Sequence, residues 1–375
     1  MKQKIKIILF LIIILLVVLF LTNLFVKKDT IDIGVMTVLS GKAANIGLPT
    51  KEAIILAQNE INNNGGINGR ELNLIIEDDK CNASDGITAI NKLVNINQVK
   101  IVLGAGCSSG TISSGPIAEK NKVILLVTGA ASPNITYLGD YVFRVLSSSA
   151  DRGKILAEDA VSKKYVIAII YESTDYTKPT IDVFKNRFNE LKGTILLEEA
   201  LSGEDDYKSS VIKIVSSKPD AILIMTQTTQ NLSKILTILE QFNYSSQIYG
   251  NEQIGSEEIL SKHKNYLEGA IFSDSKLDEN SVLFQKFIKE FNKVYTDKLP
   301  ASIIFFAGGY DAVYILKEAI EYCQSEKDTE CIKNYLYSIK DRDGAAGKLT
   351  IDQNGDSIEK AVLKIIRNGK VEELN

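Results

Sequence analysis

The sequence predicts an α/β protein built from two similar domains. In the first part of the chain, short apolar segments alternate with segments whose apolar residues recur at helical spacing. The same alternation begins again after residues 141–144. Strands that alternate with helices form parallel sheets. Because no low-complexity linker separates the two series, we expect short connections and a cleft between the domains.

Apolar, β-rich segments predict four strands in the first series, at residues 30–39, 72–77, 101–103 and 123–127. Helical spacing predicts the helices of this series at residues 51–62, 84–94 and 111–119. The first helix is followed by Asn63-Asn64-Gly65-Gly66, which is a helix stop signal.

The second series predicts strands at residues 166–171, 195–199, 221–225 and 248–250. Its helices are expected at residues 150–162, 180–191, 207–216 and 233–242. The rest of the chain predicts a strand at 270–272 and helices at 282–295, 301–321 and 332–338. It ends in a hairpin-like pair of arms, 347–351 and 361–367, around a turn at 352–356.

The first 28 residues have the pattern of a membrane segment. A basic start precedes an apolar run from Ile7 to Val26, and Lys27-Lys28 end it. About 20 apolar residues are enough to span a bilayer, whereas the apolar core of a secretory signal is shorter. We therefore expect residues 1–28 to form an uncleaved transmembrane signal anchor, with a long cleaved signal peptide as the alternative. The lysines on either side favour placing the main domain outside the cell.

Charge and motifs exclude several classes of function. Without the five lysines of the first 28 residues, the chain has 38 basic and 47 acidic residues, a net charge near −9. Nucleic-acid binding needs a basic face, so no nucleic-acid partner is expected. Zinc-protease, Walker and dinucleotide motifs are absent. The single histidine, His263, lies in a polar stretch and is expected to be solvated, so neither an enzyme nor a cofactor is predicted.

Four cysteines are consistent with an exported chain: Cys81, Cys107, Cys323 and Cys331. An even number of cysteines in such a chain predicts disulfides, and four cysteines allow three pairings. Zinc is the competing interpretation. The spacings contain no C-x-x-C pair and no histidine is near, so no metal site is expected.

Residues 100–114, KIVLGAGCSSGTISS, are the candidate binding element. An apolar strand ends at Gly104, and small hydroxyl-bearing residues follow where a helix would begin. Backbone N–H groups and hydroxyls at a helix N-terminus bind carboxylates or phosphates. The alternative is that Ser108 or Ser109 only caps the helix.

The chain resembles the leucine/isoleucine/valine-binding group of type I periplasmic solute-binding proteins. The resemblance runs from about Ile31 to the C-terminus and depends on short motifs in family order. These are Leu39-Ser40-Gly41, residues 61–69, residues 77–81, Gly106-Cys107-Ser108-Ser109, residues 129–133, residues 171–176, Gly250-Asn251-Glu252 and Gly309-Tyr310-Asp311-Ala312. It implies two Rossmann-like lobes joined by a three-segment hinge that closes on an amino acid. The lobes would be residues 30–148 plus 275–346 and residues 149–274 plus 347–375.

The resemblance also implies a ligand site. Ser108, next to Ser109, would bind the ligand carboxylate. The loop Gly129, Ala130, Ala131 and Ser132 is one residue shorter than usual, which leaves open whether Ala131 or Ser132 takes the hydroxyl-donor position. Tyr176 would pack on the ligand and Glu252 would pair with its ammonium. The alternatives are a structural aromatic at Tyr176 and a solvated loop acid at Glu252.

Side-chain specificity and the disulfides complete what the resemblance implies. Asn45-Ile46 and Gln227 stand where family members often have aromatic residues, so the pocket should suit a polar amino acid, an amide or a urea-like solute. Cys81 and Cys107 match a family disulfide, which would hold Ser108 in place. Cys323 and Cys331 would form the second bridge, with free surface thiols as the alternative.

The function that follows is extracytoplasmic capture of an amino acid or related zwitterion or amide. The protein would pass its ligand to an ABC importer, with the permease as its partner and the N-terminal helix in the membrane. The alternative is the ligand-binding ectodomain of a sensor.

Overall fold

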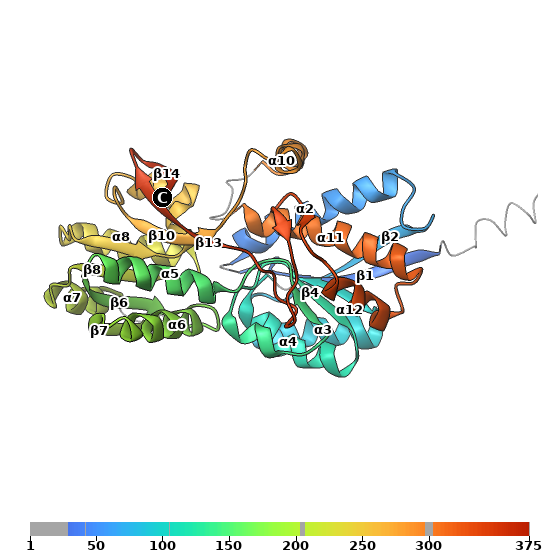
Figure 1. Cartoon of the computed structure of the whole chain (residues 1–375), viewed down its shortest axis with the longest axis horizontal. Coiled ribbons are helices and arrows are strands. Elements are labelled where there is room, and N and C mark those ends of the chain that lie inside the picture. Colours follow the sequence, from blue (N-terminus) through green and yellow to red (C-terminus); the bar gives the residue numbers. More distant parts are fainter. Residues whose placement is uncertain (1–28, 42, 105, 203–206, 297–302, 375) are drawn as a thin grey trace, which may run out of the picture.

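A computed structural model of the chain describes residues 29–374, apart from residues 42, 105, 203–206 and 297–302. Two lobes lie side by side along the long axis, each built around its own sheet (Figure 1). The expected membrane segment at residues 1–28 falls outside the described residues. Within the described part, no helix combines the length and apolar character needed to span a membrane.

The first lobe contains a parallel five-stranded sheet in the order β2-β1-β3-β4-β5. Its strands are β1 (Thr30–Thr37), β2 (Glu71–Asp78), β3 (Ile101–Gly104), β4 (Ile124–Val127) and β5 (Val142–Arg144). Its helices are α2 (Ala44–Asn63), α3 (Ala83–Asn91) with a π-helical extension at Lys92–Ile96, α4 (Ser108–Lys120), α10 (Val282–Val294), α11 (Ile304–Cys323) and α12 (Thr329–Tyr337). A 3₁₀ turn spans Pro133–Tyr137.

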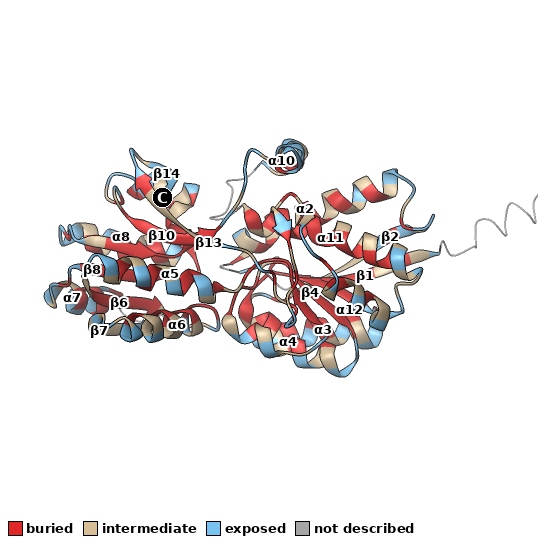
Figure 2. Cartoon of the chain, viewed as in Figure 1, coloured by how far each residue is buried: buried red, intermediate tan, exposed pale blue. Residues whose placement is uncertain are grey.

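Alternate side chains of the first sheet enter two different cores. Ile31, Ile33 and Val35 of β1 pack with α2 and α11 on one face. Met36 and Val102 pack with α3 and α4 on the other face. A strand covered on both faces is apolar throughout, which is why β3 and β4 are apolar runs in the sequence. Figure 2 shows the central strands of both sheets as the buried part of each lobe.

The second lobe contains a seven-stranded sheet in the order β14-β13-β10-β9-β8-β6-β7. Its strands are β6 (Val166–Glu172), β7 (Thr194–Leu201), β8 (Ala221–Met225), β9 (Gln247–Gly250), β10 (Ile271–Ser275), β13 (Ala361–Arg367) and β14 (Lys370–Glu373). Its helices are α5 (Ser149–Ser162), α6 (Thr177–Glu190), α7 (Tyr207–Ser216), α8 (Thr229–Gln241) and α9 (Glu257–His263), with a 3₁₀ turn at Glu252–Gly255. Strands β6 to β10 are parallel, whereas β13 and β14 add to the edge antiparallel.

Three chain segments cross between the lobes and meet at one point. The Ser147 and Ser275 hydroxyls lie 3.4 Å apart, and the Ser147 N–H donates to Glu359 at 3.4 Å. These three residues belong to the segments after β5, at the end of β10 and before β13, respectively. The three connections between the lobes are therefore in contact with one another.

The C-terminal hairpin expected from the sequence is wrong. The first arm is β12 (Lys348–Leu349), which pairs with β11 (Arg342–Asp343). The second arm is β13, which pairs with β10 and β14 in the other lobe. The sequence assigned residues 347–375 to the second lobe, but Leu349 and Ile351 are buried in the core of the first lobe. Apolar alternation predicted both arms but carried no information about which sheet each arm would join.

His263 was also wrongly expected to be solvated. It is 5% exposed, and its ring nitrogens lie 2.8 Å from a Glu240 oxygen and 2.9 Å from the Ser233 hydroxyl. Tertiary contacts between α8 and α9 therefore bury a side chain whose sequence neighbours are polar. Both ring nitrogens have a hydrogen-bond partner, so the role of His263 is structural.

Arg144, at the end of β5, is 1% exposed and connects two segments of the first lobe that are far apart in the sequence. Its guanidinium donates to the Ser132 carbonyl at 2.8 Å and to Asp356 at 2.6 Å. The Asp356 carboxylate also accepts from Thr136. One cation thus ties the loop after β4 to the segment that leads into the third crossover.

We expect Arg144→Met to lower the free energy of unfolding by about 3–5 kcal/mol, because it leaves the Asp356 carboxylate without its cation. Urea unfolding followed by circular dichroism measures this. The matched control is Arg367→Met, which breaks an exposed pair with Glu372 and should cost about 1 kcal/mol or less. Equal small losses in both variants would contradict a structural role for Arg144.

Candidate functional site

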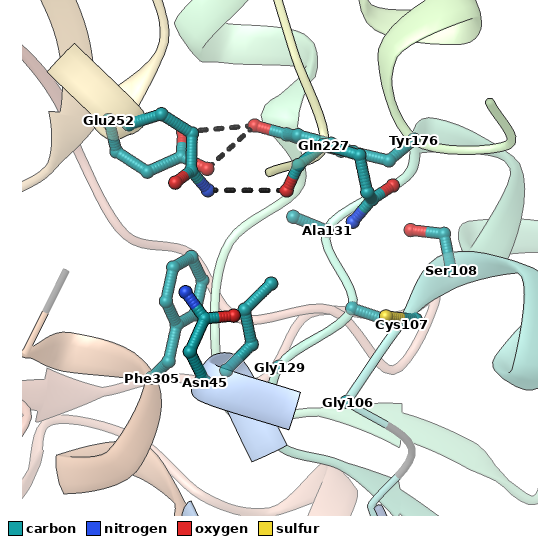
Figure 3. A pocket seen from close by; sticks show the side chains of 13 residues that line it. Asn45, Gly106, Cys107, Ser108, Gly129, Ala131, Tyr176, Gln227, Glu252 and Phe305 are labelled. Atoms are coloured by element: carbon teal, nitrogen blue, oxygen red, sulfur yellow. Dashed lines mark hydrogen bonds between the residues drawn. The ribbon is translucent and has the colours of Figure 1, made fainter. Parts of the chain in front are cut away.

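A pocket opens between the lobes at the carboxyl ends of the parallel strands, the usual ligand position in open α/β sheets (Figure 3). The space not filled by atoms is about 520 Å³, including open solvent at the mouth of the pocket. Its lining is Asn45, Ile46, Gly106, Cys107, Ser108, Gly129, Ala130, Ala131, Tyr176, Gln227, Glu252, Gln253 and Phe305. Its position at the strand ends is where small ligands bind in such folds.

Ser108 is the first residue of α4 and faces this pocket. Its Oγ accepts the Ser132 N–H at 3.2 Å, so the hydroxyl proton is not used in that bond. The first N–H groups of a helix have no partner within the helix, and the helix dipole favours an anion there. The Ser108 hydroxyl and the first N–H groups of α4 thus lie together at this end of the pocket. The helix-cap alternative is wrong, because Cys107 is the N-cap residue and no side chain caps α4.

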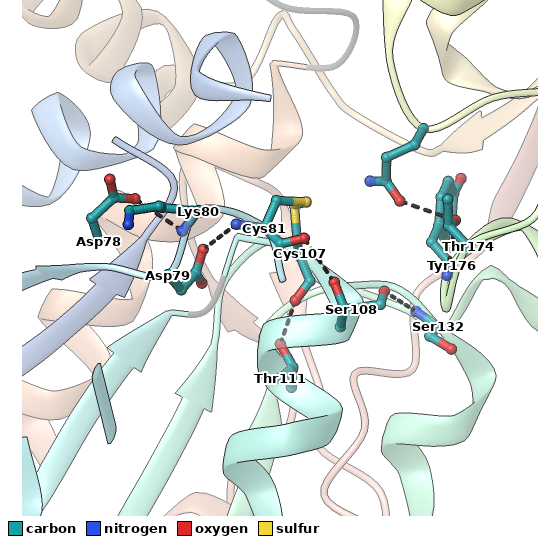
Figure 4. Close-up of a disulfide and its surroundings, with 12 residues drawn as sticks. Asp78, Asp79, Lys80, Cys81, Cys107, Ser108, Thr111, Ser132, Thr174 and Tyr176 are labelled. Atoms are coloured by element: carbon teal, nitrogen blue, oxygen red, sulfur yellow. Dashed lines mark hydrogen bonds between the residues drawn. A yellow bond between two sulfur atoms is a disulfide. The ribbon is translucent and has the colours of Figure 1, made fainter. Parts of the chain in front are cut away.

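The Cys81–Cys107 disulfide is confirmed and holds the start of α4 against the loop after β2 (Figure 4). The Cα atoms of the two cysteines lie 5.2 Å apart. The Ser109 hydroxyl donates to the Cys81 carbonyl at 3.0 Å, so Ser109 braces this corner and does not line the pocket. The Cys323–Cys331 disulfide, between α11 and α12, is confirmed as well, and the free-thiol alternative is wrong.

Asp79 lies behind the disulfide and is fully buried. One oxygen accepts the Cys81 N–H at 3.0 Å, and the other lies beside Gly110 without a hydrogen-bond partner among the described residues. Burial raises the pKa of Asp79 to about 6. A Cβ atom at position 110 would stand 3.0 Å from the carboxylate, which gives the glycine a packing reason.

The loop after β4 presents backbone rather than a hydroxyl to the pocket. Gly129, Ala130 and Ala131 line it, whereas Ser132 does not. The Ser132 hydroxyl accepts the Asn134 N–H at 3.4 Å, and its own N–H is bonded to Ser108. Of the two open alternatives, Ala131 therefore takes the pocket-facing position, and the loop contributes no side-chain donor.

The opposite wall comes from the second lobe and centres on Glu252. The Tyr176 hydroxyl lies 2.9 and 3.1 Å from the two Glu252 oxygens, and the Arg152 guanidinium lies 3.2 Å away. Glu252 is 2% exposed, so the solvated-acid alternative is wrong. Tyr176 is 6% exposed and lines the pocket, bonded to that carboxylate.

Burial dominates the electrostatics of this wall. It raises the pKa of Glu252 above its ordinary value, and the Arg152 charge opposes the rise. Burial also raises the pKa of Tyr176 far above the ordinary value, with the Glu252 charge acting in the same direction. Tyr176 is therefore a neutral donor at physiological pH.

Two glutamines complete the second-lobe wall. The Gln227 amide oxygen accepts the Thr174 hydroxyl at 3.2 Å, and the Gln253 amide lies 3.5 Å from the Gln227 carbonyl. Together with Asn45 from the first lobe, they give the pocket three carboxamides. Ile46 and Phe305 provide the apolar surface.

Sequence reasoning missed Arg152, Gln253 and Phe305. Gln253 directly follows the predicted acid, and this adjacency was an available signal. Phe305 opens α11 far along the chain, and Arg152 lies within the first turns of an ordinary helix. No local pattern marks either residue, because only the fold brings them to the pocket.

The model of a known protein family, described as periplasmic binding protein, matches residues 30–363. The chain belongs to this family. This chain is 26% identical over 334 residues to the Leu/Ile/Val-binding protein BraC3 of Rhizobium johnstonii, and the match covers 87% of this chain and 88% of the relative. The family is one of binding proteins, not enzymes.

Solved structures share the fold. The leucine-binding protein of Thermotoga maritima superposes with a TM-score of 0.82 at 24% identity, covering 92% of this chain and 98% of that one. A branched-chain amino acid transporter substrate-binding protein of Streptococcus pneumoniae, solved with isoleucine, gives a TM-score of 0.80 at 24% identity, covering 92% and 98% of the respective chains. The periplasmic binding protein thus has the type I two-lobe architecture predicted from its sequence.

Cys81 and Cys107 are 26 residues apart in the sequence. Replacing both by alanine should lower the free energy of unfolding by about 3–4 kcal/mol, because the bridge closes a loop of this length and so restricts the unfolded chain. The same change at Cys323 and Cys331, which are only 8 residues apart, should cost about 2–3 kcal/mol. Guanidinium unfolding of the two double variants measures the difference. A larger loss at the short loop would contradict this ranking.

Proposed function

We propose that this periplasmic binding protein captures an amino acid, or a related small zwitterion or amide, by closure of its two lobes, and delivers it to an ABC importer. The observation that carries the proposal is the complementary polarity of the two walls. Ser108 and the α4 N-terminus supply donors on one lobe, and Glu252 supplies a buried acceptor on the other. The names of the relatives, which are amino-acid-binding proteins, support the same ligand class.

In this proposal the ligand carboxylate accepts from the Ser108 hydroxyl and from N–H groups at the start of α4. Backbone groups of Gly129 to Ala131 border it. The ligand ammonium lies against Glu252, and the Tyr176 ring packs on the ligand. Pairing both charges is required, because burying either one alone costs several kcal/mol.

The remaining lining favours a polar side chain on the ligand. Asn45, Gln227 and Gln253 offer amide donors and acceptors, whereas Ile46 and Phe305 cover the apolar part. A polar amino acid or an amide would satisfy these groups better than a purely aliphatic side chain, since unpaired buried amides are costly.

We assign lobe 1 to residues 30–148 and 275 to about 356, and lobe 2 to residues 149–274 and about 357–375. This moves the last boundary of the sequence-based division by about ten residues, in keeping with the burial of Leu349 and Ile351 in the first core. Closure would turn the lobes about the contact of Ser147, Ser275 and Glu359.

The proposed location is outside the cytoplasmic membrane. The basic and apolar pattern of residues 1–28 supports an uncleaved anchor, with a cleaved signal as the alternative. An anchored binding protein would stay near its permease partner. The names of the relatives favour transport over the sensor alternative.

The chain in mild detergent should show a rise in melting temperature with some members of a panel of amino acids, amides, urea and short peptides. A ligand that binds only the folded, closed protein stabilises it by mass action, by about 2.7 kcal/mol at one hundred times its Kd. A thermal-shift screen measures this. Stabilisation by none of the amino acids or amides would contradict the proposed ligand class.

Glu252→Gln should weaken binding of an active amino acid at least tenfold, because the ammonium loses its anionic partner. The variant also leaves Arg152 unpaired, so the double variant Arg152→Gln/Glu252→Gln should recover stability without recovering affinity. Calorimetry and thermal unfolding separate the two effects. Unchanged affinity in the folded double variant would refute the ammonium role of Glu252.

A further inference from the structure

The polar side chains that line the pocket are mostly uncharged. Among the described lining residues, Glu252 alone carries a charge at neutral pH. Three other lining residues, Asn45, Gln227 and Gln253, end in carboxamides. In the proposed binding mode Ser108 and Glu252 are occupied by the two charged groups of the ligand. The carboxamides are then the groups that meet the side chain of the ligand, and their orientation decides what that side chain must offer.

The contacts of Thr174 fix which end of the Gln227 amide faces the pocket. The Thr174 Oγ accepts the N–H groups of Tyr176 and Thr177 at 3.3 and 3.2 Å. Because these two bonds use both lone pairs of the hydroxyl, Thr174 meets the amide as a donor, and it donates to the Gln227 Oε1 at 3.2 Å. The Gln227 Nε2 has no hydrogen-bond partner among the described residues, and Figure 3 shows the amide directed into the pocket. Gln227 therefore presents a donor.

The backbone of Gln227 is held by Glu172 at the end of the neighbouring strand β6. One Glu172 carboxylate oxygen accepts the Gln227 N–H at 2.7 Å, and the other accepts the Asn231 amide at 2.7 Å. The main chain and the side chain of Gln227 are thus both tied to the loop after β6. A donor that is already positioned costs less conformational entropy when a ligand binds.

Gln253 is oriented the opposite way. It is 6% exposed, and its Nε2 donates to the Gln227 carbonyl at 3.5 Å. A carbonyl oxygen can only accept, so the amide nitrogen of Gln253 has to face it. The Gln253 Oε1, which has no partner in the part of the chain that the structure describes, is left as an acceptor. Asn45 is exposed and makes no hydrogen bond to a described residue, so its amide can turn either end to a ligand and sets no preference.

We propose that Gln227 and Gln253 form a donor–acceptor pair that selects a ligand with a neutral carboxamide or ureido group at the end of its side chain. The inference rests on the proposed function and narrows its ligand class. The C=O of the ligand accepts from the Gln227 Nε2, and the NH₂ of the ligand donates to the Gln253 Oε1. Both amides of the protein are then satisfied, as buried polar groups require.

The same pair rejects charged and aliphatic side chains of similar size. A carboxylate can only accept, so it meets the Gln253 Oε1 without a proton to offer, and no described lining residue supplies a cation for it. An ammonium group can only donate, so it leaves the Gln227 Nε2 unpaired. An aliphatic side chain packs on Ile46 and Phe305 but leaves both glutamines unpaired. Sites that leave buried polar groups unpaired discriminate strongly.

The first experiment is calorimetry of the full chain in mild detergent with matched pairs of amino acids. L-glutamine is compared with L-glutamate, L-asparagine with L-aspartate, and L-citrulline with L-ornithine, and L-leucine is the aliphatic probe. We expect at least one of the three neutral ligands to bind about 100-fold or more tightly than its charged counterpart and than L-leucine. Equal or tighter binding of the charged counterparts or of L-leucine would overturn the inference and leave amino-acid capture standing.

The second experiment assigns the preference to the two glutamines. Gln227→Met and Gln253→Met each remove one amide at nearly constant length, and each should lower the affinity for the neutral ligand relative to L-leucine at least about tenfold. The matched control is Gln230→Met, which is exposed on α8 outside the pocket and should leave this ratio unchanged. Thermal unfolding checks that each variant is folded. An unchanged ratio in either folded pocket variant would overturn the paired arrangement.

Failure of this inference and failure of the proposed function give different results. If none of the seven amino acids binds, the thermal-shift panel decides between them. Stabilisation only by amino acids without a carboxamide or ureido group would overturn the donor–acceptor pair alone. Stabilisation by none of the amino acids or amides would overturn the proposed function, and the inference with it.

Discussion

The buried contact of Arg152, Glu252 and Tyr176 is the constraint on which the second wall of the pocket depends. A carboxylate that is 2% exposed must be paired, and the three groups come from α5, the 3₁₀ turn after β9 and the start of α6. The Glu252 carboxylate, the proposed acceptor for a ligand, is therefore held in place by its own neighbours. Pre-organisation of this kind reduces the entropy cost of binding.

The wall of the pocket in the first lobe is held in place by a disulfide and hydrogen bonds rather than by a buried ion pair. The Cys81–Cys107 bridge fixes the start of α4, and the Ser132 N–H fixes the Ser108 hydroxyl. Arg144 holds the Ser132 carbonyl and Asp356 together, which connects the ligand loop to the third crossover. One buried side chain therefore fixes the loop after β4 relative to the segment that leads into the third crossover.

The candidate site was predictable wherever its residues lie in short motifs at strand ends. Ser108, Tyr176, Gln227 and Glu252 follow strands, and parallel strands bring their carboxyl ends to one edge. Ser109 and Ser132 were predicted to line the pocket but do not. Each directly follows a lining residue, Ser108 or Ala131, and its own side chain bonds elsewhere. Arg152 and Phe305 could not be found, because each lies in a helix whose pattern gives only an amphipathic face.

The sequence by itself determined the α/β class, the two-series organisation, the disulfide potential and the strand-end motifs, because these depend on local periodicity and residue type. The tertiary structure decided which sheet β13 joins, that Leu349 and Ile351 pack in the first lobe, and that Ala131 rather than Ser132 faces the pocket. It also decided that a helix arginine neutralises the pocket carboxylate. Such choices depend on contacts between residues far apart in the chain, and a charge is balanced only by the groups that folding brings within a few ångströms.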